Sequence, residues 1–345
     1  MLDLPRNILD EVSIDAPWEL VETFSKTPRW KPDDVAASCD MIVERLKAHG
    51  VAVEVLRPKL YLSIPFDARI EANGASFRAK PPAYSTDARE GLTAELVYVP
   101  AKISTSINTL FDKSQDAELS AAERIAGKIV ISEGFSFPGK ILEFEQKGAV
   151  GVIAVNPGAD AHWGICTSIW GTPELDDLPR KPGIPVAAVS MPDGKKLIEM
   201  AEKGESATLF TTMEEGWYEQ PVPIVTIKGS ENPDEFVLLH GHYDSWDVGV
   251  GDNATGDATL LEIARVLSQK PGSVKRSVRI VWWPGHSTGR YAGSTWFADH
   301  FAIHMDGSAA DKGAHDGATE RTTVEKVRYI ARVGFVDLSG EVVWR

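Results

Sequence analysis

The sequence has few cysteines, no long apolar run and no surplus of positive charge. Only Cys39 and Cys166 occur among 345 residues. They are far apart and lack metal-ligand spacing, which argues against a disulfide framework and a cysteine-based zinc site. We expect both to be small buried or half-buried residues. No segment approaches roughly eighteen uninterrupted apolar residues, so we expect no membrane-spanning helix.

Acidic residues outnumber basic ones in this chain. Fifty Asp and Glu against 36 Lys and Arg give a formal net charge of −14. A surplus of this sign disfavours nucleic acid or an anionic membrane surface as a partner. The first residues carry neither the basic stretch nor the apolar core of a secretory signal. We therefore expect a cytoplasmic, soluble protein with no nucleic-acid partner and no membrane partner.

Periodicity divides the chain into three parts. Apolar residues at helical spacing predict two helices over 16–50, and strand patterns continue to about residue 80. From residue 81 short strands separated by glycine and proline predict an inserted β-rich (α+β) module. We assign residues 1–80 to the N-terminal part of a host domain, 81–215 to the insert and 216–345 to the rest of the host domain. The predicted fold class is α/β, with a mixed sheet in the host domain.

The centre of the insert predicts a compact βαβ unit. Residues 127–134 and 148–156 have the pattern of short buried strands, and residues 140–147 between them form an amphipathic helical pattern. A further strand over 183–190 precedes a helix predicted over 195–203. The glycines that begin the second strand make no dinucleotide-binding fingerprint, so we expect them to serve packing.

An apolar strand that ends in a histidine carries the strongest functional signal. Residues 235–239 are followed by His242 and Asp244, so the carboxyl end of a buried strand delivers an imidazole where open α/β sheets bind ligands. Metal-bound histidines usually donate their second N–H to a carboxylate or a carbonyl. We therefore expect Asp244 to orient the ring of His242.

A glycine-rich turn follows this histidine. Gly249 and Gly251 allow the backbone to fold back, which predicts that Asp252 lies beside His242 at the start of the next helix. The alternative is that Asp252 and Asn253 only cap that helix, which we predict over residues 255–269.

These residues resemble the signature of a peptidase family. His-x-Asp-Ser-Trp at 242–246, Asp-Asn-x-x-Gly at 252–256 and Leu-Leu-Glu-Ile-Ala-Arg at 260–265 are similar to the co-catalytic di-zinc aminopeptidases and glutamate carboxypeptidases of clan MH. The resemblance implies that His242 ligates one zinc ion, that Asp252 bridges two, and that Asp244 supports the histidine. Roughly residues 90–210 resemble the protease-associated domain that some of these peptidases carry as an insert.

The strand predicted over 275–283 leads into a departure from this signature. In the family the equivalent strand runs into a Glu-Glu pair that supplies the general base and a zinc ligand. This chain has Pro284-Gly-His286-Ser287 there and keeps only the Gly-Ser at 293–294. Imidazole is a zinc ligand, and its ordinary pKa of about 6.5 suits a general base. His286 is therefore a candidate metal ligand or catalytic base; a turn histidine in a protein that lost the chemistry is the alternative.

The C-terminal part is a second departure from the family. Members supply another zinc-ligating Asp on a later strand and a further downstream His. Here His304, Asp306 and His315 are candidate ligands, or ordinary loop residues. The resemblance implies that the host domain is the catalytic domain, and we expect this domain to be incomplete, without the segment that finishes its sheet. Because an unpaired sheet edge exposes backbone groups, we expect marginal stability or a homo- or hetero-oligomer that covers the edge.

Two functions from different classes remain. The first is a metal-dependent hydrolase of peptide or small amide bonds that uses one or two divalent cations, zinc by resemblance. Its candidate metal ligands are His242, Asp252 and His286, and its candidate catalytic residues are His286 and Asp244. The second is a non-catalytic, peptidase-like binding scaffold, since function depends on the site and not on the fold. We favour the hydrolase because a scaffold has no chemical need for His242, Asp244 and Asp252 together.

Overall fold

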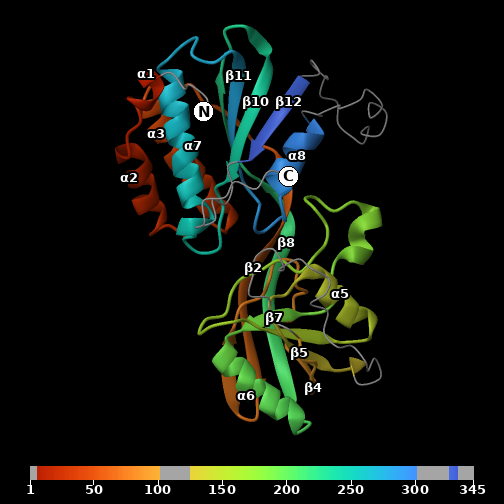
Figure 1. The fold of residues 1–345 in the computed structure, drawn as a ribbon. Helices are drawn as coiled ribbons and strands as arrows, with labels where there is room; N and C mark the ends of the chain where they lie inside the picture. The colour runs from red at the N-terminus through yellow and green to blue at the C-terminus, as the bar shows by residue number, and fades with distance from the viewer. Residues whose placement is uncertain (1–5, 102–124, 301–325, 333–345) are drawn as a thin grey trace. The chain divides into compact units, whose positions relative to one another are not determined.

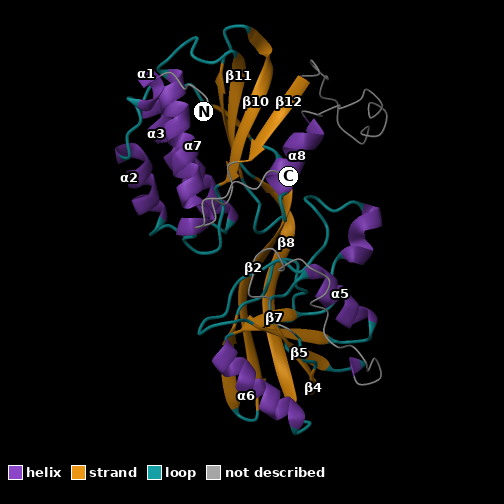
Figure 2. Ribbon diagram, viewed as in Figure 1, coloured by secondary structure: helices purple, strands orange, loops and turns teal. Residues whose placement is uncertain are grey.

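The computed structural model describes residues 6–101, 125–300 and 326–332. These residues form two compact units. The first comprises the described residues within Met1–Leu60, Tyr218–His286 and Tyr291–Arg345, and the second comprises those within Tyr61–Trp217 and Ser287–Arg290. Both units combine helices with a mixed sheet (Figure 2), so the predicted α/β class is confirmed. In the described ranges no helix has the length and apolar character needed to cross a membrane.

The first unit is a five-stranded sheet with helices on both faces. Its described helices are α1 (Arg6–Leu9), α2 (Asp15–Phe24), α3 (Pro32–Ala48), α7 (Thr255–Ser268) and α8 (Ala292–His300), and a short helical turn, η4 (Val250–Ala254), precedes α7. Its strands are β1 (Glu54–Leu56), β9 (Val222–Ile227), β10 (Asn232–His242), β11 (Arg276–Trp283) and β12 (Lys326–Arg332). The strand order is β1-β9-β11-β10-β12. Strand β10 runs parallel to β11 and β12, whereas β9 runs antiparallel to β1 and β11.

Alternation along β11 assigns its side chains to two separate cores. Ile280 and Trp282 pack into the cluster that also contains residues of α2, α3 and α7. Val281 and Trp283 point the other way and pack with Phe297 of α8. Figure 1 shows the same arrangement, with α2, α3 and α7 on one side of the sheet and α8 on the other. Because helices cover both faces, this strand is apolar at every position of its second half.

The second unit is a seven-stranded sheet with two longer helices. Its strands are β2 (Lys59–Ala72), β3 (Ala75–Ala79), β4 (Leu92–Tyr98), β5 (Ile129–Glu133), β6 (Gly151–Val155), β7 (Val186–Val189) and β8 (Ser206–Glu219). Its helical segments are α5 (Pro138–Gln146), η3 (Leu175–Arg180) and α6 (Met191–Glu202). The strand order is β3-β2-β8-β4-β5-β6-β7. Backbone hydrogen bonds of 2.9 and 2.8 Å between Lys80 and Ala188 join the two ends of this order, so the sheet closes partly on itself.

The predicted βαβ unit is confirmed, since α5 connects the parallel strands β5 and β6. The next helix begins earlier than expected. Helix α6 begins at Met191 and not at Lys195, because the Ser190 side chain accepts a hydrogen bond from the Asp193 N–H and so caps the helix. The Ser-x-x-Asp spacing was the available signal for this start.

Residues 61–80 belong to the sheet of the second unit. The sequence analysis placed them with the N-terminal part of the catalytic domain. They form most of β2 and all of β3, which pair with each other in register from Ala68 with Ala79 to Ala72 with Ala75. Strand β2 also neighbours β8, which lies far along the chain, so a distant pairing partner decides this membership and a local strand pattern does not. Cys39 and Cys166 are both buried and free, as expected.

A pair of helical glycines offers a test of packing in the second unit. A Cβ on Gly194 of α6 would lie 2.2 Å from Cγ1 of Val155, whereas a Cβ on Gly139 of α5 meets nothing within 4 Å. We predict that Gly194→Ala destabilises the protein by about 1–3 kcal/mol through overpacking. The control Gly139→Ala is neutral or stabilising by up to about 1 kcal/mol, since alanine is the better helix former. Calorimetric unfolding of the full chain measures both; equal melting behaviour would contradict the packing argument.

Candidate metal centre

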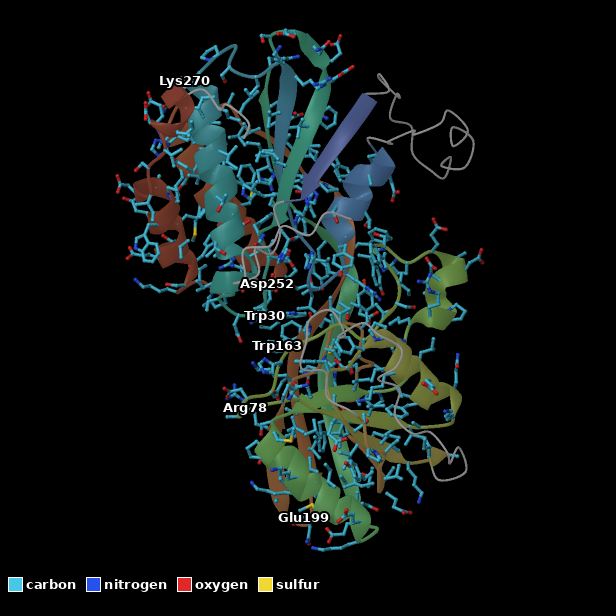
Figure 3. All side chains as sticks on the ribbon, in the orientation of Figure 1. Trp30, Arg78, Trp163, Glu199, Asp252 and Lys270 are labelled. Atoms are coloured by element: carbon cyan, nitrogen blue, oxygen red, sulfur yellow. The ribbon has the colours of Figure 1, made fainter. Side chains whose placement is uncertain are left out.

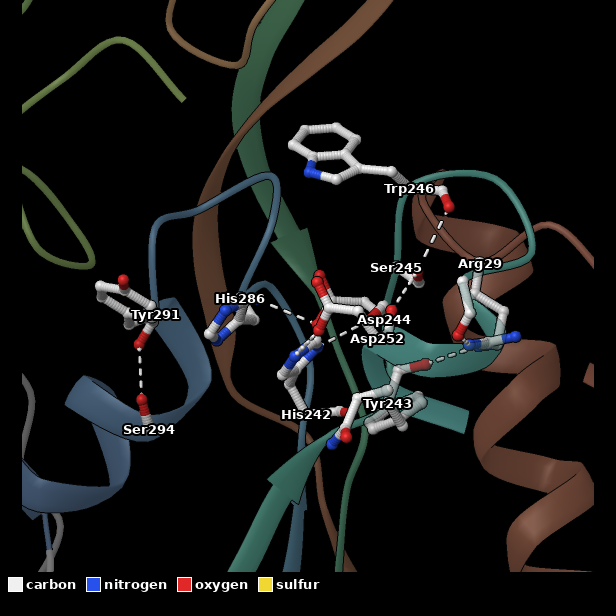
Figure 4. Close-up of polar contacts among 12 residues, drawn as sticks. Arg29, His242, Tyr243, Asp244, Ser245, Trp246, Asp252, His286, Tyr291 and Ser294 are labelled. Carbon is white, nitrogen blue, oxygen red and sulfur yellow. Dashed lines mark hydrogen bonds and ion pairs between the residues drawn. The ribbon is translucent and has the colours of Figure 1, made fainter. Parts of the chain in front are cut away.

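Two histidines lie at the carboxyl ends of neighbouring parallel strands. His242 ends β10 and pairs in register with Trp283, the last residue of β11, and His286 follows three residues later. Because the strands are parallel, both residues come to the same edge of the sheet. Their rings stack, with centroids 3.7 Å apart and planes inclined by 8° (Figure 4).

Two hydrogen bonds fix the ring of His242. Its Nδ1 lies 2.8 Å from the carbonyl oxygen of Asp244, and its Nε2 lies 2.9 Å from Oδ1 of Asp252. Asp244 therefore orients the ring, as expected, but through its backbone carbonyl. Its buried carboxylate is 3.9 Å from Nδ1 and instead accepts the backbone N–H of His286 at 3.0 Å. In this geometry both ring nitrogens donate. When a metal ion displaces the proton on Nε2, the donor bond from Nδ1 to the carbonyl keeps the ring oriented for a ligand at Nε2.

The turn before α7 brings Asp252 to this ring. Gly249 has φ +37°, and a Cβ there would lie 1.5 Å from the Ser245 hydroxyl oxygen, so only glycine fits. The Ser245 hydroxyl donates to the carbonyl oxygen of Asp252 at 2.6 Å. Figure 3 labels Asp252 at the N-terminal end of α7, with Lys270 beyond the other end. The glycine turn predicted from the sequence therefore has the expected effect.

Neither Asp252 nor Asn253 caps α7. The N-cap residue of that helix is Ala254, and no side chain of the described residues caps it. The Asn253 amide, which is buried, donates instead to the carbonyl oxygen of His242 at 3.1 Å. The capping alternative is therefore wrong. The sequence predicted that Asn253 lies beside His242 together with Asp252, but it did not assign this hydrogen bond to the Asn253 amide.

The charge of His242 depends on its carboxylate neighbours. Burial disfavours the charged ring, but the hydrogen bond to Asp252 and the charges of Asp244 and Asp252 outweigh it and raise the pKa of His242 to about 9. The same surroundings favour any cation at Nε2.

The donor atoms at this point fit part of a metal coordination sphere. Nε2 of His242 and Oδ1 of Asp252 converge, and the Asp252 side chain is half exposed, which leaves room for further ligands. Across residues 6–101, 125–300 and 326–332, no group of three or more His, Cys, Asp and Glu side chains has the arrangement of a complete site. The other candidate ligands, His304, Asp306 and His315, lie outside the described residues.

The turn after β11 holds His286 by backbone contacts. The Gly293 N–H donates to the Pro284 carbonyl oxygen at 3.1 Å, and a Cβ on Gly293 would lie 2.5 Å from that oxygen. The Tyr291 N–H donates to the His286 carbonyl at 3.1 Å, and the two rings meet edge to face with centroids 4.6 Å apart. The glycine kept from the signature is thus needed for a close backbone approach that places His286.

A buried carboxyl near the site escaped the sequence analysis. Asp257 of α7 is fully buried, and neither of its carboxyl oxygens has a hydrogen-bond partner among the described residues. Burial raises its pKa well above the ordinary value, despite the opposing charges of His242 and Arg29. Asp257 lies three residues after Ala254 and four residues before Leu261, which places it on the apolar stripe of the helix. This position was the signal in the sequence that its carboxyl would be buried.

Comparison with known families agrees with this geometry. Residues 224–332 match the family model described as "Peptidase family M28", and residues 92–197 match the model described as "PA domain". The first segment is therefore similar to M28 peptidases, and the second is similar to PA domains. The resemblance derived from the motifs around His242 is confirmed.

Curated relatives match part of this chain at low identity. "Carboxypeptidase Q" of Rattus norvegicus is 27% identical over 228 residues, which cover 62% of this chain and 44% of the relative. "Leucine aminopeptidase 2" of Arthroderma otae is 28% identical over 265 residues, which cover 75% and 48%. The chain thus spans about half the length of the curated relatives it matches.

Solved structures show the same fold. An M28 peptidase precursor from Shewanella amazonensis superposes with a TM-score of 0.63 at 20% identity, covering 86% of this chain and 69% of that one. A zinc aminopeptidase from Bacillus subtilis gives 0.59 at 20% identity, covering 84% and 66%. The predicted combination of a peptidase-like domain with a protease-associated insert is confirmed as a fold. The cytoplasmic location and the oligomeric state stay predictions.

Asp257 generates a prediction about stability against pH. Because its folded pKa lies above the ordinary 3.8, the folded state keeps a proton that the unfolded state releases. This contribution to stability is complete below about pH 4 and is lost as pH rises toward the folded pKa. We predict that Asp257→Asn matches the parent in stability near pH 4 and becomes more stable than the parent as the pH rises toward 8. Melting curves of metal-free protein across this range measure it, with Asp10→Asn, an exposed site, as control; parallel curves would contradict it.

Proposed function

We propose that this chain is a metal-dependent hydrolase of peptide or small amide bonds that uses zinc. The observation that carries the proposal is the convergence of His242 Nε2 and Asp252 Oδ1 at 2.9 Å, with the opposite ring nitrogen fixed on a carbonyl. This pair lies within the segment that matches the M28 family model. Relatives named as a carboxypeptidase and a leucine aminopeptidase support a terminal peptide residue as the substrate class.

Each described residue of the site has a distinct role in this proposal. His242 and Asp252 would hold a zinc ion, which would supply Lewis-acid chemistry at the substrate carbonyl and the attacking water. The Asp244 carbonyl keeps the histidine in the tautomer that presents Nε2, and its carboxylate holds the backbone of His286. Asn253 fixes the carbonyl of His242, so that the end of β10 and the start of α7 move together.

His286 is the proposed general base. Its ring lies against the face of His242, whose Nε2 converges with Asp252. By the resemblance, it follows the strand that runs into the acidic pair in the family. In this role the imidazole accepts a proton from the attacking water and returns it to the leaving amine. If a ring nitrogen of His286 ligated the ion, that nitrogen would have no lone pair left to accept the proton. His286 would then be a ligand and not the general base.

A non-catalytic scaffold is the second candidate. It is favoured by the incomplete ligand set among the described residues and by the absence of the Glu-Glu pair from the turn after β11. The two candidates differ in one observable: a hydrolase of this type requires a tightly held divalent ion, and a scaffold does not.

The metal assignment predicts the behaviour of two alanine variants. His242→Ala and Asp252→Ala each remove one of the two converging donors, so both should lose stoichiometric zinc. Elemental analysis of protein purified without chelator, followed by zinc titration, measures this. His49→Ala, which changes an exposed histidine, should retain the parent's zinc. Parent-like zinc content in both site variants would sink the assignment, and a zinc-free parent protein would favour the scaffold.

The role of His286 predicts a split between chemistry and metal binding. As general base, its replacement in His286→Ala should lower kcat by about two to four orders of magnitude while zinc stays bound. The measurements are turnover of aminoacyl and peptide amides and zinc content of the same samples. Loss of zinc would make His286 a ligand. Unchanged turnover together with unchanged zinc content would show that His286 is a turn histidine without a role in the chemistry.

A further inference from the structure

Arg29 is a buried cation in the connection between α2 and α3. Its side chain is fully buried, which is rare for arginine and is tolerated only when the guanidinium is satisfied by hydrogen bonds. The guanidinium carbon lies 4.2 Å from the centroid of the Phe24 ring, so one face of the group packs on an aromatic side chain. Every N–H of an arginine is a donor, and the group stays charged when buried.

Nε, Nη1 and Nη2 of Arg29 all donate to the loop that follows β10, and Nη1 also donates to the Phe24 carbonyl at the end of α2 at 3.1 Å. We call residues 243–249 the site loop, because it joins His242 to the turn that carries Asp252. Arg29 Nε donates to the Tyr243 carbonyl at 2.9 Å, Nη1 to the Val248 carbonyl at 2.8 Å, and Nη2 to the Gly249 carbonyl at 3.1 Å. One planar group therefore holds both ends of the loop. Figure 4 shows the guanidinium beside Tyr243.

The backbone of Arg29 fixes the middle of the same loop. Its N–H donates to the Asp247 carbonyl at 2.9 Å, and its carbonyl accepts the Ser245 N–H at 2.7 Å. Ser245 in turn donates its hydroxyl to the Asp252 carbonyl. A continuous path of hydrogen bonds thus runs from Arg29 through Ser245 to Asp252.

We propose that Arg29 is a positioning residue for the metal site, which holds the site loop so that Asp252 stays against His242. The inference rests on the proposed function, since it assigns to Arg29 the geometry of the two proposed ligands. Arg29 touches neither ligand side chain in the contacts above and acts through the loop. Its planar fork matches three carbonyls at once, which a lysine ammonium on a flexible stem does not reproduce.

The test compares zinc affinity with stability in the full chain. We expect Arg29→Met to weaken zinc binding by about 10- to 100-fold, the usual effect of removing a group that orients a ligand, and Arg29→Lys to fall between it and the parent. Competition with a chromophoric chelator gives the dissociation constants. The matched control is Arg45→Met, because Arg45 donates to the Met41 carbonyl and to the Thr23 hydroxyl and so links α2 to α3 without contacting the site loop.

A purely structural role for Arg29 gives a different result. In that case Arg29→Met and Arg45→Met would both lower the melting temperature and leave the zinc affinity unchanged, which would overturn the proposal. If Arg29→Met does not fold, Arg29→Lys carries the comparison.

Hydrogen exchange supplies a readout that does not depend on zinc. In the metal-free folded protein we expect faster exchange of the amides in residues 243–249 in both Arg29 variants and no change there in Arg45→Met. If the parent protein binds no zinc, the proposed function is wrong. Hydrogen exchange then still decides whether Arg29 holds the site loop. Parent-like exchange in the Arg29 variants overturns the inference.

Discussion

The parallel pairing of β10 with β11 is the constraint on which the site depends. It aligns His242 with Trp283 and brings the ends of both strands to one edge of the sheet. The stacked rings of His242 and His286 follow from that alignment, because the turn after β11 begins where β10 ends. Apolar side chains on both faces of β11 stabilise this pairing. Those on one face pack with α2, α3 and α7, and those on the other face pack with α8. Packing of the two cores therefore sets the geometry of the polar edge.

Backbone carbonyls accept several of the hydrogen bonds that orient the residues of this site. The Asp244 carbonyl sets the tautomer of His242, and the His242 carbonyl binds Asn253. Carbonyls of the site loop receive the guanidinium of Arg29. Carbonyl positions are fixed by backbone conformation, so a ligand held by them has little freedom to reorient. Gly249 is required where the loop turns, because a Cβ there would lie 1.5 Å from the Ser245 hydroxyl oxygen.

Buried charge is concentrated at the same end of the sheet. Arg29, Asp244 and Asp257 are all fully buried, and His242 is nearly so. Asp244 and Arg29 have hydrogen-bond partners, whereas the carboxyl of Asp257 lacks them among the described residues and is held neutral by burial. Such an arrangement costs folding stability. It is retained around a candidate reaction centre, where proteins commonly accept such a cost.

The sequence by itself determined the local part of the site. His242, Asp244, Asp252 and the glycine turn lie within eleven residues, so strand pattern and turn chemistry sufficed to bring them together. Tertiary structure decided the rest. The contact between Arg29 and Tyr243 spans 214 residues, and the pairing of residues 61–80 with the second unit depends on strands far along the chain. Likewise, the stack of His286 on His242 exists only because two strands pair in parallel. No local pattern encodes these contacts, since they are selected by the packing of whole elements and not by the conformational preferences of neighbouring residues.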